Sequence, residues 1–433
     1  MSQKDGFTNY MNIEIPISRG LNGQYSVPGD KSISHRALMI AAIADGMSTI
    51  EGCSSAADPR STRRCLESLG VKFDLAASQY RVEGRGLRGL SGSRAPLDAG
   101  NSGTTIRLMS GILAGQQFSS EIIGDASLSR RPMLRVFEPL RLMGAHIHGT
   151  ENNTAPILIE TVPGLHGIEY AMPVSSAQVK SAVLFAGAFA EGITTVREKI
   201  QTRDHTERML GLKTTVHEGV WKTSIEGGRT IPAQSFFIPG DISAAAFLIV
   251  AGLIVPHSSI CILNVGLNPT RTELLHVLKG LGASIEIQNE RLESGERIGD
   301  VHVLTSDLQG DMILQGETVA RVIDEIPILA IAALFSKGAF HLRNAEELRR
   351  KESDRITSMV ANLHTLGVDA EEYPDGFGFE SSGNLQGGII ESFDDHRIAM
   401  AFGIAGLRIP AITIKHAECV DISFPGFWGF FLW

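Results

Sequence analysis

The chain has few cysteines, few aromatic residues and no excess of positive charge. Its 433 residues include only four cysteines, Cys53, Cys65, Cys261 and Cys419, and none of them forms a Cys-x-x-Cys pair. This scatter argues against a disulfide framework and against a zinc site, and it fits a reducing cytosol. The formal net charge of −9 also argues against a nucleic-acid-binding surface.

Long apolar runs are absent as well. No uninterrupted apolar stretch reaches the length that spans a membrane. Residues 1–10 are polar and lack the apolar segment of a signal peptide. We therefore expect a cytoplasmic protein that binds neither nucleic acid nor membrane. The length suggests two or more domains.

One unit recurs six times along the chain. Each copy has a helix rich in Ala, Leu and Ile, then a Gly or Pro break, then a β-branched strand. These helices are expected near 34–46, 105–115, 179–187, 244–252, 327–335 and 397–406. Four copies add a second helix that ends in Leu-Gly or Met-Gly followed by Ala or Val, where glycine suits the helix end. Because the first helices are apolar nearly all round, we expect them to be buried.

Six units divide naturally into two similar α/β domains of three units each. The turn at 28–32 (PGDKS) has a second copy at 239–243 (PGDIS), and this copy indicates the boundary. We expect a first domain at 25–240 and a second domain made of 1–24 and 241–433. The sixth unit is truncated or altered, because it ends in an aromatic tail (423–433) instead of a helix. We expect this tail to leave an exposed apolar patch that promotes association. The alternative is a tail that packs where the missing helix would lie and covers the core of the second domain.

Charged and small polar residues gather at the starts of the buried helices. In 28–36 (PGDKSISHR), Asp30 suits a helix cap, and Lys31, Ser32 and Arg36 follow in the first turns. Free N–H groups and the helix dipole favour an anion there. A capped helix with solvated charges fits this stretch equally well. However, Ile242 replaces Lys31 in the second copy of the turn, which favours a functional role for the lysine.

Similar clusters open the other units. Residues 100–105 (GNSGTT) form a small-residue loop that lets backbone N–H groups approach an anion. Basic or acidic clusters stand at 174–180 (VSSAQVK), 203–208 (RDHTER), 349–355 (RRKESDR) and 394–397 (DDHR). Each cluster alone is also compatible with a turn, a cap or a solvated face, and His205 is expected to be a capping or surface histidine.

Taken together, the motifs resemble those of the 5-enolpyruvylshikimate-3-phosphate synthases, a family of enolpyruvyl transferases. The resemblance runs from about residue 28 to 425. Its motifs stand at 28–36 (PGDKSxSHR), 100–104 (GNSGT), 131–132 (RP), 176–178 (SAQ), 203–207 (RDHTE), 351–355 (KESDR) and 395–397 (DHR). It implies a fold of two domains, each of three βαβαββ units, that close on substrate.

The resemblance also implies a reaction of the shikimate pathway to chorismate and the aromatic amino acids. Phosphoenolpyruvate and shikimate 3-phosphate give an enolpyruvyl ether and phosphate through a tetrahedral intermediate, without metal or organic cofactor. Glyphosate binds in place of phosphoenolpyruvate in sensitive members of this family, and the motifs at 176–181 and 203–207 also resemble a bacterial subgroup that includes glyphosate-insensitive members. We expect a monomer with these two small-molecule substrates.

Residue roles carry over by matching position. The resemblance implies Lys31, Asp324 and Glu352 as catalytic residues, with Asp324 as base on the 5-hydroxyl and Glu352 as proton donor. It implies that shikimate 3-phosphate is held by Lys31, Ser32, Arg36, Ser176, Gln178, Arg203, Asp324 and Lys351. It implies that phosphoenolpyruvate is held by Lys31, Gly103, Arg131, Gln178, Arg355 and Arg397.

Two alternatives remain open from the sequence. One is an enolpyruvyl transferase that acts on UDP-N-acetylglucosamine, whose hallmark is a catalytic cysteine; the four cysteines here lie outside the charged motifs. The other is a catalytically dead binding protein of the same fold. The absence of a lysine just before Phe424-Pro425, where some family members have one, keeps this second alternative open.

Overall fold

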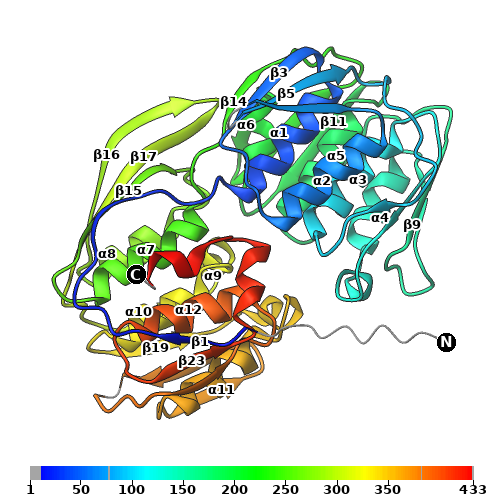
Figure 1. The fold of residues 1–433 in the computed structure, drawn as a ribbon. Coiled ribbons are helices and arrows are strands. Elements are labelled where there is room, and N and C mark those ends of the chain that lie inside the picture. The colour runs from blue at the N-terminus through cyan, green and yellow to red at the C-terminus, as the bar shows by residue number, and fades with distance from the viewer. Residues whose placement is uncertain (1–10, 77–78, 382, 432–433) are drawn as a thin grey trace, which may run out of the picture.

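The computed structural model describes residues 11–76, 79–381 and 383–431. The polar start at 1–10 and the last two residues of the aromatic tail lie outside this range. Buried hydrophobic residues of the described chain form two clusters. The first core comes from 33–238, and the second core comes from 13–27 and 242–431. Figure 1 shows the first core at the upper right and the second core at the lower left.

Two described sheets of the first core follow one plan, in which a buried helix joins a parallel strand pair and a second helix leads into an antiparallel hairpin. In the other sheet the buried helix precedes a strand whose parallel partner comes from a distant part of the chain. One unit contains α1 (Lys31–Ile43), β3 (Asp45–Glu51), α2 (Ala57–Ser68), β4 (Lys72–Ala76) and β5 (Gln79–Arg85). The next contains β6 (Leu97–Asp98), α3 (Gly103–Ala114), β7 (Ser120–Ile123), η1 (Leu128–Arg130), α4 (Leu134–Leu142), β8 (His146–His148) and β9 (Ile157–Glu160). The third contains β10 (Glu169–Ala171), α5 (Ala177–Gly187), β11 (Ile193–Glu198), α6 (His205–Met209), β12 (Thr214–His217) and β13 (Val220–Glu226).

The second core repeats the plan. Its first unit contains α7 (Ile242–Ile254), β15 (Ser259–Gly266), α8 (Glu273–Gly280), β16 (Ser284–Glu293) and β17 (Glu296–Leu304). Its second contains β18 (Met312–Leu314), α9 (Glu317–Val322), α10 (Ile326–Leu334), β19 (Ala339–Leu342), η2 (Glu346–Arg350), α11 (Arg355–Thr365), β20 (Ala370–Tyr373) and β21 (Gly376–Glu380). Its last contains β22 (Gly388–Glu391), α12 (His396–Gly406), β23 (Ile412–Lys415), η3 (Ala417–Ile422) and η4 (Phe427–Phe430).

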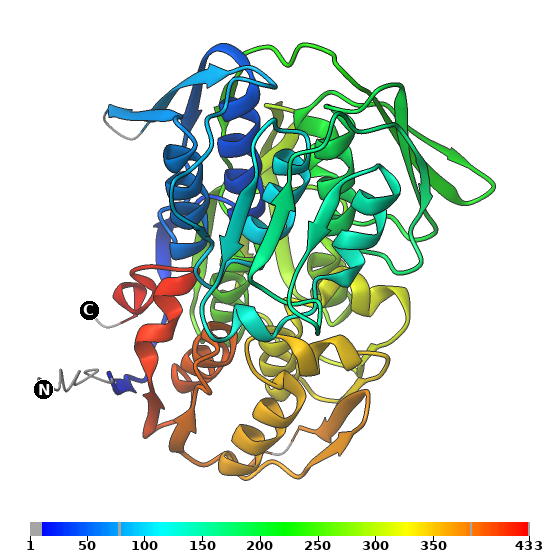
Figure 2. The ribbon, with the colours of Figure 1, turned by 90° about the vertical axis from the view of Figure 1, so that its right-hand side faces the viewer.

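Distant strands complete three of the sheets. β14 (Ser235–Phe237) runs parallel to β3, and β2 (Asn22–Tyr25) runs parallel to β15. β1 (Ile13–Ile15) pairs antiparallel with β23. The N-terminal strands therefore pack with the second core, as the repeat pattern predicts. In Figure 2 the dark-blue N-terminal segment lies low, beside the orange and red end of the chain, while most of the blue-to-green chain lies above.

The first helix of each unit is buried on nearly every side, which confirms the expected inside-out α/β fold. Small residues make this possible because they let backbones approach closely. A methyl group at Gly111 of α3 would lie 2.1 Å from the carbonyl oxygen of Ala182 in α5. Only glycine permits this distance between the two helices.

Two turns lie side by side where the chain passes between the cores. Gly29 and Gly240 form an antiparallel bridge. The N–H of Asp30 donates to the oxygen of Pro239, and that of Asp241 donates to the oxygen of Pro28. These paired crossings and the separate cores support a division into domains 25–240 and 1–24 with 241–433, which we propose.

The described part of the aromatic tail is packed, so the expected exposed patch is wrong there. Phe424, Phe427 and Trp428 are between 0% and 6% exposed. The indole N–H of Trp428 donates to the oxygen of Ala417 over 3.0 Å. Two short 3₁₀ turns separated by Gly426, whose φ is 81°, replace the missing helix and direct the rings into the second core.

Candidate active site

The predicted site residues lie at or near the N-termini of buried helices. Capping side chains confirm these starts, since Asp30, Ser102, Ser176 and Asp395 each accept a hydrogen bond from a backbone N–H of the helix they begin. In the first core, α1 holds Lys31, Ser32 and Arg36, α3 begins with Gly103, and η1 is followed by Arg131. Ser176 and Gln178 lie at the start of α5, and α6 is preceded by Arg203. In the second core, Asp324 precedes α10, α11 is preceded by Lys351 and Glu352 and begins with Arg355, and α12 holds Arg397.

Asp324 lies where the two cores meet. Its Oδ2 is 2.5 Å from Arg203 Nη2 of the first core, and its Oδ1 is 3.7 Å from Lys351 Nζ. Arg397 Nη1 donates to its backbone oxygen over 2.7 Å. Burial acts to raise the pKa of the Asp324 carboxyl, but Lys351, Arg203, Arg397 and Arg355 outweigh it and hold that pKa well below its usual range.

Arg355 connects three carboxylates. Its guanidinium is 1% exposed, with Nε 2.7 Å from Asp395 Oδ2 and Nη2 2.6 Å from Glu352 Oε2. Its Nη1 lies 3.8 Å from Asp324 Oδ1. A planar fork suits this task, because each nitrogen can face a different oxygen. Asp324 and Glu352 thus lie at different terminal nitrogens of one cation.

Glu352 is ionised in this environment. Burial acts to raise the pKa of its carboxyl, but the cations Arg355, Arg131 and Lys31 lower it far more. The first-core residues Arg131 and Lys31 thus act on a carboxyl of the second core. Burial also lowers the pKa of His396, to about 4, so this imidazole is neutral near pH 7.

A second group surrounds the Gly103 loop. Arg107 Nη1 donates to Gln178 Oε1 over 2.8 Å, and Gln178 Nε2 donates to Thr104 Oγ1 over 3.0 Å. A methyl group at Gly103 would lie 2.6 Å from Arg107 Nη1 and 3.5 Å from Arg131 Nη1. Gly103, Gln178 and Arg131 are therefore neighbours around Arg107.

The remaining predicted residues lie on the first-core side. Lys31 Nζ is 3.2 Å from Asp58 Oδ2. Arg36 donates through Nη1 to the oxygen of Ser32 and through Nε to Thr206 Oγ1. Ser176 Oγ is occupied as the cap of α5.

Sequence reasoning was wrong about His205 and did not assign Arg107. His205 is 1% exposed, and its Nδ1 lies 2.8 Å from Glu296 Oε1 of the second core, so it is neither a surface nor a capping residue. Its partner is 91 residues away, and no local pattern indicates it. Arg107 had a local signal, since an arginine inside an apolar helix needs a polar partner.

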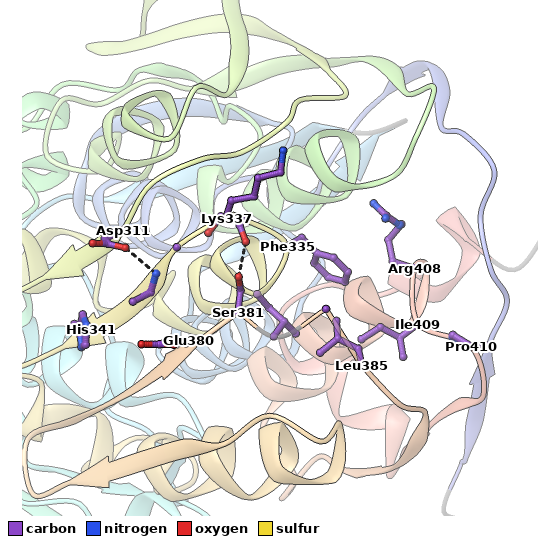
Figure 3. A pocket seen from close by; sticks show the side chains of 15 residues that line it. Asp311, Phe335, Lys337, His341, Glu380, Ser381, Leu385, Arg408, Ile409 and Pro410 are labelled. Atoms are coloured by element: carbon purple, nitrogen blue, oxygen red, sulfur yellow. Dashed lines mark hydrogen bonds between the residues drawn. The ribbon is translucent and has the colours of Figure 1, made fainter.

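The large open hollow in the structure lies elsewhere. It encloses about 1000 Å³ and is bordered by Asp311, Lys337, His341, Glu380 and Arg408 among others. Figure 3 shows these side chains around the end of α10 and the start of β19. Within the described chain, its lining includes none of the predicted site residues.

Neither a metal centre nor a membrane-spanning helix is found among the described residues. They contain no group of three or more His, Cys, Asp or Glu side chains placed to hold a metal ion. None of their helices is both long enough and apolar enough to cross a membrane.

The overall fold is shared with a solved enolpyruvyl transferase. The enolpyruvyl transferase NikO from Streptomyces tendae superimposes with a TM-score of 0.73 over 97% of this chain and 96% of its own, at 16% identity. At that identity the likeness shows the fold, which is that of an enolpyruvyl transferase.

Closer relatives then show the family. The family model described as EPSP synthase (3-phosphoshikimate 1-carboxyvinyltransferase) matches residues 15–431, and the chain belongs to this family. A 3-phosphoshikimate 1-carboxyvinyltransferase of Salinibacter ruber is 47% identical over 96% of this chain and 97% of its own. An EPSP synthase structure from Acinetobacter baumannii has a TM-score of 0.87 and 42% identity, covering 97% of both chains.

Proposed function

We propose that this chain transfers the enolpyruvyl group of phosphoenolpyruvate to the 5-hydroxyl of shikimate 3-phosphate and releases phosphate. The observation that carries the proposal is the pair of carboxylates, Asp324 and Glu352, that both contact the Arg355 guanidinium at the junction of the cores. Several cations surround the pair, and the two substrates together bring two phosphates and two carboxylates that need such partners.

The substrates themselves would adjust the two carboxyls. In the unliganded protein, Arg203 and Lys351 lie on Asp324 and lower its pKa. A bound phosphate would compete for these cations and add negative charge nearby. Both changes raise the pKa of Asp324, which makes it a better base. The same reasoning lets Glu352 take up a proton once phosphoenolpyruvate neutralises Arg131 and Arg355.

The reaction proceeds in two steps, an addition followed by an elimination. In the first, Glu352 gives a proton to the methylene carbon of phosphoenolpyruvate, the 5-hydroxyl oxygen bonds to C2, and Asp324 takes the hydroxyl proton. In the second, the C2–O bond to phosphate breaks and phosphate leaves, while the Glu352 carboxylate takes a proton back from the new methyl group, which restores the double bond. Lys31 would stabilise the charge that develops on the phosphate, and Gln178 would lie between the substrates.

The cysteine-dependent alternative has little support in the structure. Burial raises the pKa of Cys53 to about 11 and those of Cys65 and Cys419 to about 12. Burial also raises the pKa of Cys261. A nucleophilic or acid–base cysteine has a lowered pKa instead.

A phosphate-release assay tests the proposal. Phosphoenolpyruvate with shikimate 3-phosphate should release phosphate, and phosphoenolpyruvate with UDP-N-acetylglucosamine should not. Asp324→Asn keeps the shape of the site and should abolish most of the turnover, while Asp311→Asn, at the distant hollow, should retain it. Turnover with the nucleotide sugar alone, or binding without turnover, would refute the proposal.

Two further proposals concern the oligomeric state and the cellular location. We propose a monomer, because a single chain supplies every predicted ligand of both substrates; light scattering of the purified protein measures its mass directly. A cytoplasmic location remains a prediction from the sequence.

A further inference from the structure

A buried lysine in α5 has no part in the site described above. Lys180 is 1% exposed and lies in a helix whose other inward residues are apolar or small. An ammonium group in such a place costs several kcal/mol unless close charges and hydrogen-bond acceptors compensate it.

Its partners all belong to one short segment. Lys180 Nζ lies 2.6 Å from Glu198 Oε1 at the end of β11 and 2.7 Å from Glu207 Oε1 in α6. It also lies 3.4 Å from the backbone oxygen of Thr202. Thr202 Oγ1 in turn donates to Glu198 Oε2 over 2.7 Å. One ammonium group therefore contacts the beginning, the middle and the end of segment 198–207.

This segment carries Arg203, which reaches across to Asp324 of the second core. Lys180 itself is in the helix that begins with Ser176 and Gln178. We infer that Lys180, Glu198 and Glu207 form a buried clamp that positions Arg203, relative to Ser176 and Gln178, for the phosphate of shikimate 3-phosphate. The inference rests on the proposed function for the identity of that ligand. Lys180 is a positioning residue, since it acts through Arg203.

The clamp also supports Arg36. Thr206, next to Glu207, accepts from Arg36 Nε over 2.7 Å, and Ser181, next to Lys180, accepts from Arg36 Nη2 over 2.7 Å. Two glutamates around one lysine leave a net negative charge, which attracts the Arg36 guanidinium. Arg36 and Arg203, which are both assigned to shikimate 3-phosphate, therefore depend on neighbours of the same buried lysine.

The test compares substrate affinities in a charge-free clamp. Removing only the ammonium group would leave two buried carboxylates facing each other, so the main variant is Lys180→Met/Glu198→Gln/Glu207→Gln. A milder variant, Thr202→Val, removes one hydrogen bond and keeps all three charges. We expect the KM for shikimate 3-phosphate to rise about 10- to 100-fold in the main variant and less in the milder one. The KM for phosphoenolpyruvate should not change.

A matched control separates positioning from general destabilisation. Val183→Ala makes a cavity in the same helix, at a side chain that is 0% exposed and outside the clamp. This variant should lose stability and keep both KM values. An equal rise of the KM for shikimate 3-phosphate in Val183→Ala would overturn the inference, and so would an unchanged KM in both clamp variants.

Hydrogen exchange without substrate distinguishes this inference from the proposed function. Amides of residues 199–204 should exchange faster in the clamp variants than in the parent and in Val183→Ala. Faster exchange in an enzyme that does not use shikimate 3-phosphate would refute the proposed function and leave the clamp standing. Unchanged exchange of these amides would overturn the clamp whatever the substrate is.

Discussion

Lys31 carries the clearest prediction at the scale of single residues. Its turn recurs at 239–243 with Ile242 in the corresponding place, and both turns have the same aspartate cap. Lys31→Met should therefore fold normally and lose about 10²-fold or more in turnover, the usual effect of removing one charge-stabilising donor. Circular dichroism and phosphate release measure the two effects. Lys72→Met, on an exposed position of β4, is the control; near-parental turnover in Lys31→Met would refute the assignment.

Glu352 is predicted to be the proton donor. Glu352→Gln keeps the size of the side chain and can still approach Arg355, but it cannot donate a proton to carbon. Turnover should fall about 10²- to 10⁴-fold, while shikimate 3-phosphate still binds. Glu346→Gln, at an exposed glutamate of η2, should have no such effect. If the loss is confined to substrate binding, Glu352 serves as an ion-pair partner and not as the acid.

Gly103 has a prediction that depends on its neighbours. The methyl group of Gly103→Ala would lie 2.6 Å from Arg107 Nη1, so it must displace the guanidinium that holds Gln178. We expect weaker phosphoenolpyruvate binding and a glyphosate inhibition constant raised about tenfold or more. Gly164→Ala is the control, because a methyl group there would meet nothing within 4 Å. Unchanged KM and inhibition constants in Gly103→Ala would place the loop outside the substrate pocket.

The C-terminal segment is the element whose structure differs most from expectation. Its sequence lacks helical periodicity and charge, so it suggested a damaged end. In the structure, the edge of the Phe427 ring packs against Phe247 of α7, with ring centroids 5.9 Å apart. Trp428 packs against Gly403 of α12. Glycine at 403 leaves the space that the indole fills.

Because the rings of the tail are packed, removing one of them should destabilise the protein. Phe427→Ala should lower the free energy of unfolding by about 3–5 kcal/mol, because the ring is 0% exposed. Urea denaturation measures the change. Leu292→Ala, at a side chain that is 71% exposed, should change the free energy of unfolding very little. Improved solubility with unchanged stability in Phe427→Ala would restore the damaged-tail interpretation.

The six buried helices show how far local pattern determines an element. Their apolar residues and their capping side chains are local properties, and the structure places each helix within a few residues of its predicted start. The second helices also follow their Leu-Gly endings. α6 is the exception in length, with five residues, and it is the helix whose sequence fits the common ending least well.

At the scale of the whole molecule, substrate should change the relation between the two cores. The predicted ligands of shikimate 3-phosphate come from both, and Arg203 and Asp324 already meet across the junction. The bound phosphate would draw Arg203 and Lys351 together from opposite sides. Small-angle scattering should show a smaller radius of gyration with shikimate 3-phosphate than without it. Arg203→Ala should reduce this compaction, and identical curves for the parent would contradict closure.

The sequence by itself determined the repeated unit, the buried helices, their caps and the motif residues. These features depend on neighbours a few positions apart, so composition, periodicity and resemblance were sufficient to predict them. Only the tertiary structure decided which distant groups meet. Arg203 pairs with Asp324, which is 121 residues away, and His205 contacts Glu296. Strand β14 pairs with β3. The burial of Lys180 between two glutamates and the inward turn of the tail belong to the same class. Each depends on how separate units pack, and packing is fixed by the shape and charge of surfaces that lie far apart along the chain.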